Sequence, residues 1–393
     1  MKGFSVARPG KLSPLADKLC KGRVRRDVRD ASNLGCKKRR PVLMPRFPRL
    51  LLIGNFLSFA GGSRSVIEDL AERLPDSGRA PICVSSFHSA WIRGIHMLST
   101  ATFRRLEYEV AVVDLYSGRA FIWGEALSLL LKALRCPFVL VLRGGALPHF
   151  ARRHPARVKG CLSRAAAVIA PSRYLAEELR SYRTDLRLLP NPLTLGAYRF
   201  RHRERARPDL VWLRAFHEIY NPLLAVKVAG LLARDFPHVC LTMIGPDKND
   251  GSLQRLQRFA AEIGFAEQII LPGGVPKGDV PSWLKKGDIF LNTTNVDNVP
   301  VSVLEAMACG LCVVSTDAGG IPHLLEHERD ALLVPVGDPE AMAIAVRRLL
   351  TEPGLAERLS YNARQKVEQF DWSMVLPHWR ALLISAAEGK RYE

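Results

Sequence analysis

Residues 292–325 read NTTNVDNVPVSVLEAMACGLCVVSTDAGGIPHLL, and the apolar run that leads into them predicts a buried strand. The polar loop that follows carries Asp297 and Asn298. Pro300 then predicts the first turn of a helix, because a proline at that position loses no needed hydrogen-bond donor. The apolar run Cys312–Ser315 predicts the next strand. Strand, loop, helix and strand in this order are typical of a parallel α/β sheet.

The start of the predicted helix is a candidate anion site. Its first backbone N–H groups, including those of Val301, Ser302 and Val303, are expected to be free, and the helix dipole adds to the attraction. Glu305 follows within the helix, where its carboxylate is able to accept two hydrogen bonds from a vicinal diol such as that of a ribose. Asp297, on the loop before, is placed to meet the hydroxyls of a second sugar. This pattern predicts a nucleotide-sugar site.

The same alternation of strands and helices extends along the chain from residue 49. In the first half, strands are predicted at Arg49–Gly54, Ile82–Val84, Val110–Val113, Phe138–Leu142, Ala166–Ala170 and Leu186–Leu189. In the second half, they are predicted at Leu210–Arg214, Cys240–Ile244, Ile269–Leu271, Ile289–Asn292, Cys312–Ser315 and Leu332–Val334. Residues 196–208, polar and basic and closed by a proline, are interpreted as a linker. We therefore expect two Rossmann-like domains that face a cleft, with ligands beyond the carboxyl ends of the strands.

Charge is unevenly distributed along the 393 residues. The chain has 57 Lys+Arg against 38 Asp+Glu, a net charge of +19, and residues 1–49 alone hold 15 Lys/Arg and 3 Asp, which is +12. We interpret this segment as a basic, disordered tail. Attachment to anionic lipid headgroups is a second interpretation and nucleic-acid binding a third, although few aromatic residues are present for base stacking. No run of 18 apolar residues predicts a transmembrane helix.

The cysteines do not predict a metal or redox site. Cys309 and Cys312 have CxxC spacing, but no second CxxC and no His pair lies near them in the sequence. The pair is expected to join a helix end to a buried strand, which is a poor setting for redox chemistry. We expect no metal and no cofactor.

The run Asp297–Gly310, with Gly319-Gly320 after it, resembles the donor-binding signature of the retaining GT-B glycosyltransferases of family 4, also called group 1 glycosyltransferases. The resemblance covers about residues 49–390. The further matching motifs are Gly61-Gly62, Ala170-Pro171-Ser172 with Tyr174-Leu175, Pro190-Asn191, Arg214 and Phe370-Asp371-Trp372.

The resemblance implies a GT-B fold in four parts: a basic tail (1–48), an acceptor-side domain (49–205), a nucleotide-sugar domain (206–370) and a C-terminal helix that crosses back (371–393). It implies a hexosyltransferase that retains anomeric configuration without a metal, acting in polysaccharide or glycolipid biosynthesis. The residues assigned to catalysis are Asp297, Arg214 and His149. The residues assigned to donor binding are Glu305, Gly61, Gly62, Arg143, Asn298, Val301, Ser302 and Val303.

The sequence departs from the family pattern at four places. The first acidic position is Asp297 where the family has Glu, and no Lys follows Arg214 within five or six residues. The family's His after the fourth strand is absent; Arg143-Gly144-Gly145 stands there, followed by His149. His323 stands where a Glu often follows Gly-Gly-Ile-Pro.

The expected partners are a nucleotide-sugar donor, a glycan or lipid-linked acceptor and an anionic membrane surface, with no specific nucleic acid. A basic surface at Arg152, Arg153, Arg157, Lys159 and Arg164 is the candidate side for the acceptor. The expected location is cytoplasmic, peripheral at the inner face of the membrane. The alternatives are an inactive GT-B protein that binds sugar nucleotides, and an epimerase of the same fold. The base, the sugar, the acceptor, the linkage and the oligomeric state do not follow from the sequence.

Overall fold

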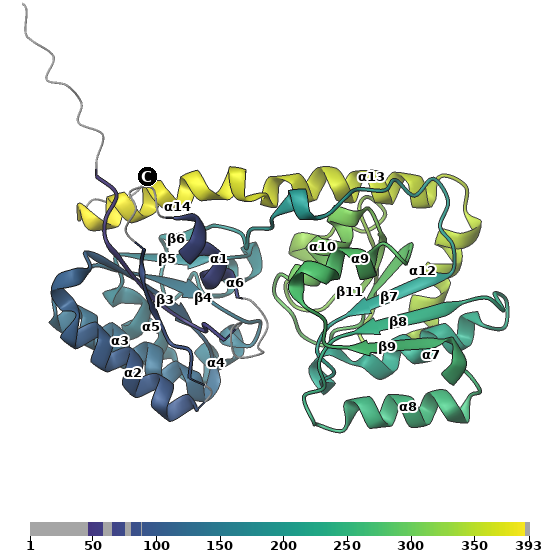
Figure 1. The fold of residues 1–393 in the computed structure, drawn as a ribbon, viewed down its shortest axis with the longest axis horizontal. Helices are drawn as coiled ribbons and strands as arrows, with labels where there is room; N and C mark the ends of the chain where they lie inside the picture. The colour runs from purple at the N-terminus through teal and green to yellow at the C-terminus, as the bar shows by residue number, and fades with distance from the viewer. Residues whose placement is uncertain (1–45, 58–64, 75–79, 88, 390–393) are drawn as a thin grey trace, which may run out of the picture. The chain divides into compact units, whose positions relative to one another are not determined.

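A computed structural model of the chain describes residues 46–57, 65–74, 80–87 and 89–389, and these residues contain two six-stranded sheets (Figure 1). The first sheet has the order β2-β1-β3-β4-β5-β6 and the second has the order β12-β11-β10-β7-β8-β9, with all pairs parallel. The predicted α/β fold with two Rossmann-like sheets is therefore confirmed. Both sheets lie in one compact unit, Pro45–Glu393.

The strands coincide closely with the apolar runs of the sequence. Those of the first sheet are β1 (Leu50–Ile53), β2 (Ile82–Val84), β3 (Val110–Leu115), β4 (Phe138–Leu142), β5 (Ala167–Ala170) and β6 (Leu186–Leu188). Those of the second sheet are β7 (Asp209–Leu213), β8 (Cys240–Ile244), β9 (Ile269–Gly273), β10 (Ile289–Asn292), β11 (Cys312–Thr316) and β12 (Leu332–Val334). The central strands are apolar on both faces because helices cover both faces of a parallel sheet.

The helices fill the intervals between strands. In the first half they are α1 (Val66–Arg73), α2 (Ala90–Phe103), η2 (Arg105–Glu107), η3 (Gly118–Ala120), α3 (Phe121–Ala133), α4 (Leu147–Arg153), α5 (Pro155–Arg164), α6 (Arg173–Glu178) and η4 (Leu195–Ala197). In the second half they are η5 (Glu218–Tyr220), α7 (Pro222–Leu232), α8 (Ser252–Glu262), η6 (Ala266–Gln268), η7 (Lys277–Asp279), α9 (Val280–Leu284), α10 (Val301–Cys309), α11 (Ile321–Leu324), α12 (Pro339–Thr351), α13 (Leu355–Val367), η8 (Glu368–Phe370) and α14 (Trp372–Ala387). Several begin at predictable caps, such as Asp371, whose side chain accepts a hydrogen bond from the Ser373 amide.

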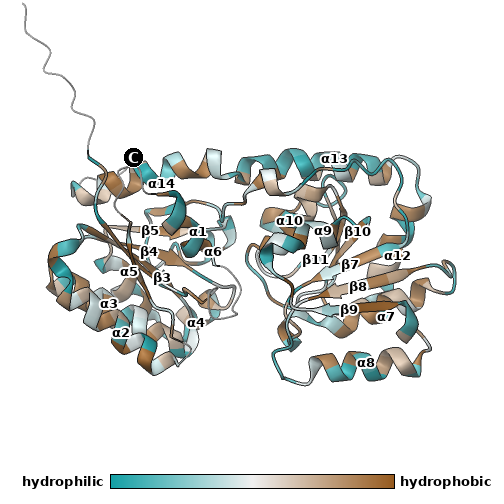
Figure 2. Cartoon of the chain, in the orientation of Figure 1, coloured by the Kyte–Doolittle hydropathy of each residue, from teal (hydrophilic) through white to brown (hydrophobic). Residues whose placement is uncertain are grey.

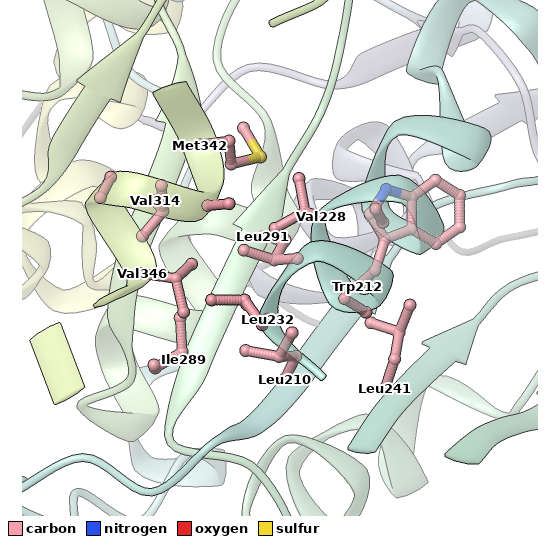
Figure 3. Packing of buried hydrophobic residues seen from close by; sticks show 14 of the residues in the cluster. Leu210, Trp212, Val228, Leu232, Leu241, Ile289, Leu291, Val314, Met342 and Val346 are labelled. Atoms are coloured by element: carbon pink, nitrogen blue, oxygen red, sulfur yellow. The ribbon is translucent and has the colours of Figure 1, made fainter. Parts of the chain in front are cut away.

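Each sheet is packed between two hydrophobic cores. On one face of the second sheet, Leu210 and Trp212 of β7 lie against Val228 and Leu232 of α7, with Val346 of α12 beside them (Figure 3). Successive side chains of a strand point to opposite faces of the sheet. Val211, which lies between Leu210 and Trp212, therefore belongs to the core on the opposite face. On one face of the first sheet, residues of α1 and of the C-terminal helix α14 complete the core.

The order of the strands places the ligand-binding edge of each sheet. In the first sheet, chain order reverses between β1 and β3, and in the second it reverses between β7 and β10. Loops that leave the carboxyl ends of such neighbouring strands diverge to opposite sides, which opens a crevice at that point. Arg214 follows β7, and Asp297 lies on the loop that follows β10.

The segment interpreted as a linker is packed against the second half. Arg203 is buried; its guanidinium forms an ion pair with Asp288 and donates to the carbonyl of Gly287 at 2.9 Å. Burial lowers the pKa of Arg203, and Asp288 opposes that shift. The basic character of residues 196–208 therefore reflects buried ion pairing as well as solvent exposure.

No helix in the described ranges is both long and apolar enough to span a bilayer. Gly61, Gly62 and residues 1–45 of the predicted tail lie outside the described residues.

Candidate functional site

Arg214 and Asp297, both predicted as catalytic, form an ion pair at the point where the second sheet reverses its strand order. Their side chains are only 17% and 14% exposed. The guanidinium carbon of Arg214 also lies 4.5 Å from the centre of the Tyr220 ring. Burial lowers the pKa of Arg214, but an arginine remains a cation at neutral pH. The site thus contains a largely buried cation that is ion-paired with a carboxylate on a loop, and the charge of Glu305 also acts on it.

The glycine pair after β11 holds that loop in place. The N–H of Gly320 donates to the carbonyl of Asp297 at 2.9 Å. Gly319 has φ +56°, a conformation that favours glycine, and a Cβ on it would overlap the same carbonyl. A Cβ on Gly320 would lie 2.9 Å from the carbonyl carbon of Asn298 and closer still to its oxygen. These glycines therefore let the 297–298 loop pack directly on the following turn.

The start of α10 offers fewer free amides than predicted. The N–H of Val303 donates to the carbonyl of Pro300 at 3.1 Å, so the prediction of a free amide at Val303 is wrong. This hydrogen bond joins residues three apart, as in a 3₁₀ turn, and it uses the N–H of Val303. Within the described ranges, no group accepts from the N–H of Val301 or Ser302, and the buried Ser302 Oγ also has no partner. Two amides and one hydroxyl therefore remain available to an anion.

Glu305 is buried on α10 and already has two partners. Its Oε1 accepts a hydrogen bond from the Tyr198 hydroxyl at 2.5 Å and forms an ion pair with Lys277. Burial, with the Glu305 charge as the second cause, raises the pKa of Tyr198. The sequence pattern contains no cation shortly after Arg214, and Lys277 supplies one beside Glu305 from a turn after β9. This placement depends on the sheet order, so no local motif reveals it.

Asn298 connects the two halves of the chain. Its carboxamide oxygen accepts a hydrogen bond from the Ser172 hydroxyl, which also caps α6 through the Leu175 amide at 3.1 Å. The backbone N–H of Asn298 donates to Asp297 Oδ1 at 2.8 Å. The carboxamide oxygen is thus engaged within the protein, and a contact of Asn298 with a donor stays a prediction.

A cavity of about 970 Å³ adjoins Asp297 and is lined by both halves. Arg143 lines it, but the guanidinium is committed to Asp114 at 2.8 Å and to Asn191 Oδ1 at 2.8 Å. Burial raises the pKa of Asp114, and burial together with the Asp114 charge raises the pKa of Tyr116 to about 12. Arg143 is thus ion-paired with a buried carboxylate at the wall of the cavity, and its predicted contact with the donor stays a prediction.

The remaining predicted residues lie apart from this constellation. His149 is exposed on α4 and does not line the cavity. In the predicted basic surface, Arg152 forms an ion pair with Glu178 at 3.2 Å and Arg157 with Glu125 at 2.5 Å. Two of the five basic residues are therefore ion-paired within the protein, and the role of this surface toward the acceptor stays a prediction.

Comparison with known proteins agrees with the geometry. Residues 198–366 match the family model of the glycosyl transferases group 1. The chain is 27% identical over 239 residues to a GDP-mannose-dependent alpha-(1-6)-phosphatidylinositol monomannoside mannosyltransferase of Mycolicibacterium smegmatis. The matched region covers 58% of this chain and 60% of that protein. It is 26% identical over 265 residues to a D-inositol 3-phosphate glycosyltransferase of Paenarthrobacter aurescens, with coverage of 64% and 65%. The chain thus matches less than two thirds of the length of these relatives.

Solved structures resemble the whole architecture. Anabaena Alr3699/HepE in complex with UDP-glucose has a TM-score of 0.67 at 16% identity, over 86% of this chain and 100% of that one. Sucrose-phosphate synthase from Thermosynechococcus elongatus has a TM-score of 0.61 at 17% identity, over 77% and 80%. At these identities the likeness establishes the fold, which is GT-B. Residues 198–366 are therefore similar to the glycosyl transferases group 1, and the described chain has the GT-B fold.

Proposed function

We propose that the protein transfers a sugar from a nucleotide-sugar donor to a glycan or lipid-linked acceptor, with retention of anomeric configuration and without a metal ion. The observation that carries this proposal is the buried Arg214 at the strand-order reversal, beside the unpartnered start of α10. A buried cation and free helix amides favour a bound anion such as a diphosphate. The names of the relatives, which are glycosyltransferases, support the reaction class.

In this proposal the diphosphate of the donor replaces Asp297 as the partner of Arg214. Asp297 is then free to accept hydrogen bonds from hydroxyls of the transferred sugar, which lies toward the cavity that Asp297 lines. Glu305 holds the ribose diol, and Lys277 adds positive charge on the same side. The amides of Val301 and Ser302 complete the anion site. The structure of HepE with UDP-glucose supports a nucleotide-sugar as the type of donor.

The chemical step follows from the charge that develops. The bond between the anomeric carbon and the diphosphate oxygen breaks, leaving positive charge on the sugar and negative charge on the leaving group. Arg214 and the α10 amides stabilise that negative charge as it forms. The acceptor hydroxyl attacks from the face that the diphosphate leaves, and its proton passes to the departing phosphate oxygen. An inverted anomer in the product would contradict this step.

The acceptor is expected in the part of the cavity that the first half lines. Trp91, Trp123 and Tyr116 contribute aromatic surface there, and Arg93 and Arg119 contribute cations. Aromatic faces suit sugar rings, while cations suit a phosphate or diphosphate linker. A glycan attached to a lipid diphosphate has both features.

The test is thermal unfolding with a panel of UDP, GDP, ADP and CMP and their sugars. A ligand at 100 times its Kd stabilises the folded state by about 2.7 kcal/mol, which raises the midpoint by several degrees. We expect one base to do so in the native chain and the shift to be lost in Glu305→Gln. The matched control is Glu352→Gln, which changes an exposed carboxylate at the C-terminal end of α12.

A second experiment separates transfer from the alternatives. The donor that binds is incubated with and without an extract of lipid-linked and free glycans, in the presence of EDTA. Transfer predicts acceptor-dependent release of the nucleotide that survives EDTA. A changed sugar nucleotide formed without acceptor would indicate an epimerase, and binding without turnover would indicate an inactive protein.

A further inference from the structure

The helices α2 and α3 present an apolar face that no described part of the chain covers. The exposed large apolar side chains on them and on the adjoining η2 turn are Trp91, Ile92, Ile95, Phe103, Leu106, Ile122 and Leu129, which we call the α2–α3 face. Phe103, Leu106 and Trp91 are 86%, 87% and 74% exposed. Single exposed apolar residues are common, but a set of this size on neighbouring helices is not.

The two helices form one continuous surface. They lie side by side in Figure 1, and Figure 2 shows hydrophobic segments along both. At one end, the rings of Trp91 and Trp123 meet edge to face at 5.4 Å, and Gly94 allows this approach because a Cβ there would overlap the Trp123 ring. At the other end, Arg105 of η2 donates to the carbonyl of Leu134, just after α3, at 3.1 Å.

The charged residues around the face that have no ion-pair partner among the described residues are positive. All four acidic residues between 90 and 135 are engaged in ion pairs: Glu107 with Arg104, Glu109 with Arg49, Asp114 with Arg143 and Glu125 with Arg157. Within the described part of the chain, Arg119, Lys132 and Arg135 have no carboxylate partner. Arg119 lies before the start of α3, and the other two lie at and beyond its last turn. The apolar face is therefore bordered at both ends by uncompensated cations.

We propose that the α2–α3 face docks on the surface of a bilayer that contains anionic lipid. An apolar face with cations at its borders and no free carboxylate matches the interface between acyl chains and anionic headgroups. A tryptophan at the margin suits the headgroup level. Trp91 and Ile122 also line the cavity, so the docked chain holds one wall of the cavity at the membrane surface. This surface differs from the α4–α5 arginines that the sequence favoured, several of which are paired within the protein.

The experiment is vesicle co-sedimentation of the full chain with phosphatidylcholine alone and with a phosphatidylcholine–phosphatidylglycerol mixture. It is run at 0.1 M and 0.5 M NaCl, where the Debye length falls from about 10 Å to about 4 Å, so binding through the basic N-terminal residues alone is lost. The test variant is Ile95→Ser with Phe103→Ser and Leu106→Ser. The control removes three exposed apolar side chains elsewhere: Ile270→Ser, Ile344→Ser and Met374→Ser.

We expect the native chain to prefer the anionic vesicles and to stay bound at the higher salt. At 0.5 M NaCl the test variant should bind at least tenfold more weakly, and the control should bind as the native chain does. The charge variant Arg119→Glu with Lys132→Glu should lose the preference for anionic lipid, which provides a readout if the triple variant does not fold. Equal binding by the native chain and the test variant would overturn the proposal.

Absence of binding to both vesicles would also overturn it. So would a concentration-dependent dimer that the test variant abolishes, since the face would then be an interface between copies of the chain. The thermal shift with the donor nucleotide separates this proposal from the proposed function. The test variant changes no residue assigned to the donor, so it should keep the full shift whether or not the chain docks on lipid.

Discussion

Replacement of Gly320 by alanine tests whether the 297–298 loop positions the site. Gly320 has an ordinary negative φ, so the substitution adds no backbone strain. Its Cβ would lie 2.9 Å from the carbonyl carbon of Asn298, whereas carbon atoms in contact prefer about 3.5–4.0 Å. The loop must therefore move by roughly 0.6–1 Å, and the hydrogen bond from the Gly320 amide to Asp297 has to adjust with it. A displacement of about 1 Å at a reacting group costs about 100-fold in rate.

The expected result is a loss of about 100-fold in kcat/KM, with the free energy of unfolding reduced by only about 1–3 kcal/mol from overpacking. The assay is release of the nucleotide from the donor that the thermal panel identifies, with urea unfolding measured in parallel. Gly196→Ala is the matched control, because Gly196 also has negative φ and a Cβ on it meets nothing within 4 Å. Native activity in Gly320→Ala would refute the assignment of the loop to the site, since the overlap exists whatever the donor is.

Three further predictions concern buried charge and pH. Arg203→Met should lower the free energy of unfolding by about 1–3 kcal/mol, measured by urea denaturation, because the buried hydrogen bonds of Arg203 to the carbonyls of Cys309 and Gly287 are lost while Asp288 keeps Arg201 and Arg207 as partners. Lys277→Met should cost about 1–3 kcal/mol by the same measurement, less than a fully buried pair, because the Glu305 partner is buried but the lysine is 43% exposed. Asp371→Asn tests how stability depends on pH. Burial disfavours the charged carboxylate of Asp371, but hydrogen bonds to that carboxylate hold its pKa below its usual range. A depressed folded-state pKa gives stability that is present above the unfolded pKa, so the native chain should lose its advantage over Asp371→Asn, measured as the difference in urea midpoints, as pH falls from about 5 to 3.

The strands and most long helices could be predicted because their signals are local. Apolar runs of three to six residues gave strands within one or two residues of those observed, and the helix predicted to begin at Pro300 is observed as Val301–Cys309. The helix α2 was not predicted, because its sequence lacks the polar face that marks a surface helix. The same absence of a polar face is what leaves Ile95 and Phe103 exposed.

From the sequence, only those residues of the candidate site that belong to a local motif could be predicted. Arg214 and Asp297 were named separately, and the structure brings them together because β7 and β10 are neighbours in the sheet. Lys277 was missed because it reaches Glu305 from the turn after β9, far from Arg214 and Glu305 in the sequence. The ion pair of Arg143 with Asp114, on the adjacent strand, could not be predicted from the sequence, and the role of Arg143 in donor binding stays a prediction.

The two buried arginines show why only one of them suits an anionic donor. Arg143 donates from Nε to Asp114 and from Nη1 to Asn191. Asp114 lies on β3 and Asn191 follows β6, so both acceptors are in the half of the chain that contains the first sheet. Arg214 instead faces a carboxylate on a loop, and within the described residues its Nε has no hydrogen-bond partner. A buried donor without an acceptor costs about 1–3 kcal/mol, and a ligand that supplies the acceptor recovers that cost on binding. An anion that binds beside Arg214 in place of the Asp297 loop carboxylate gains this free energy, whereas at Arg143 the Nε and Nη1 donors already have acceptors.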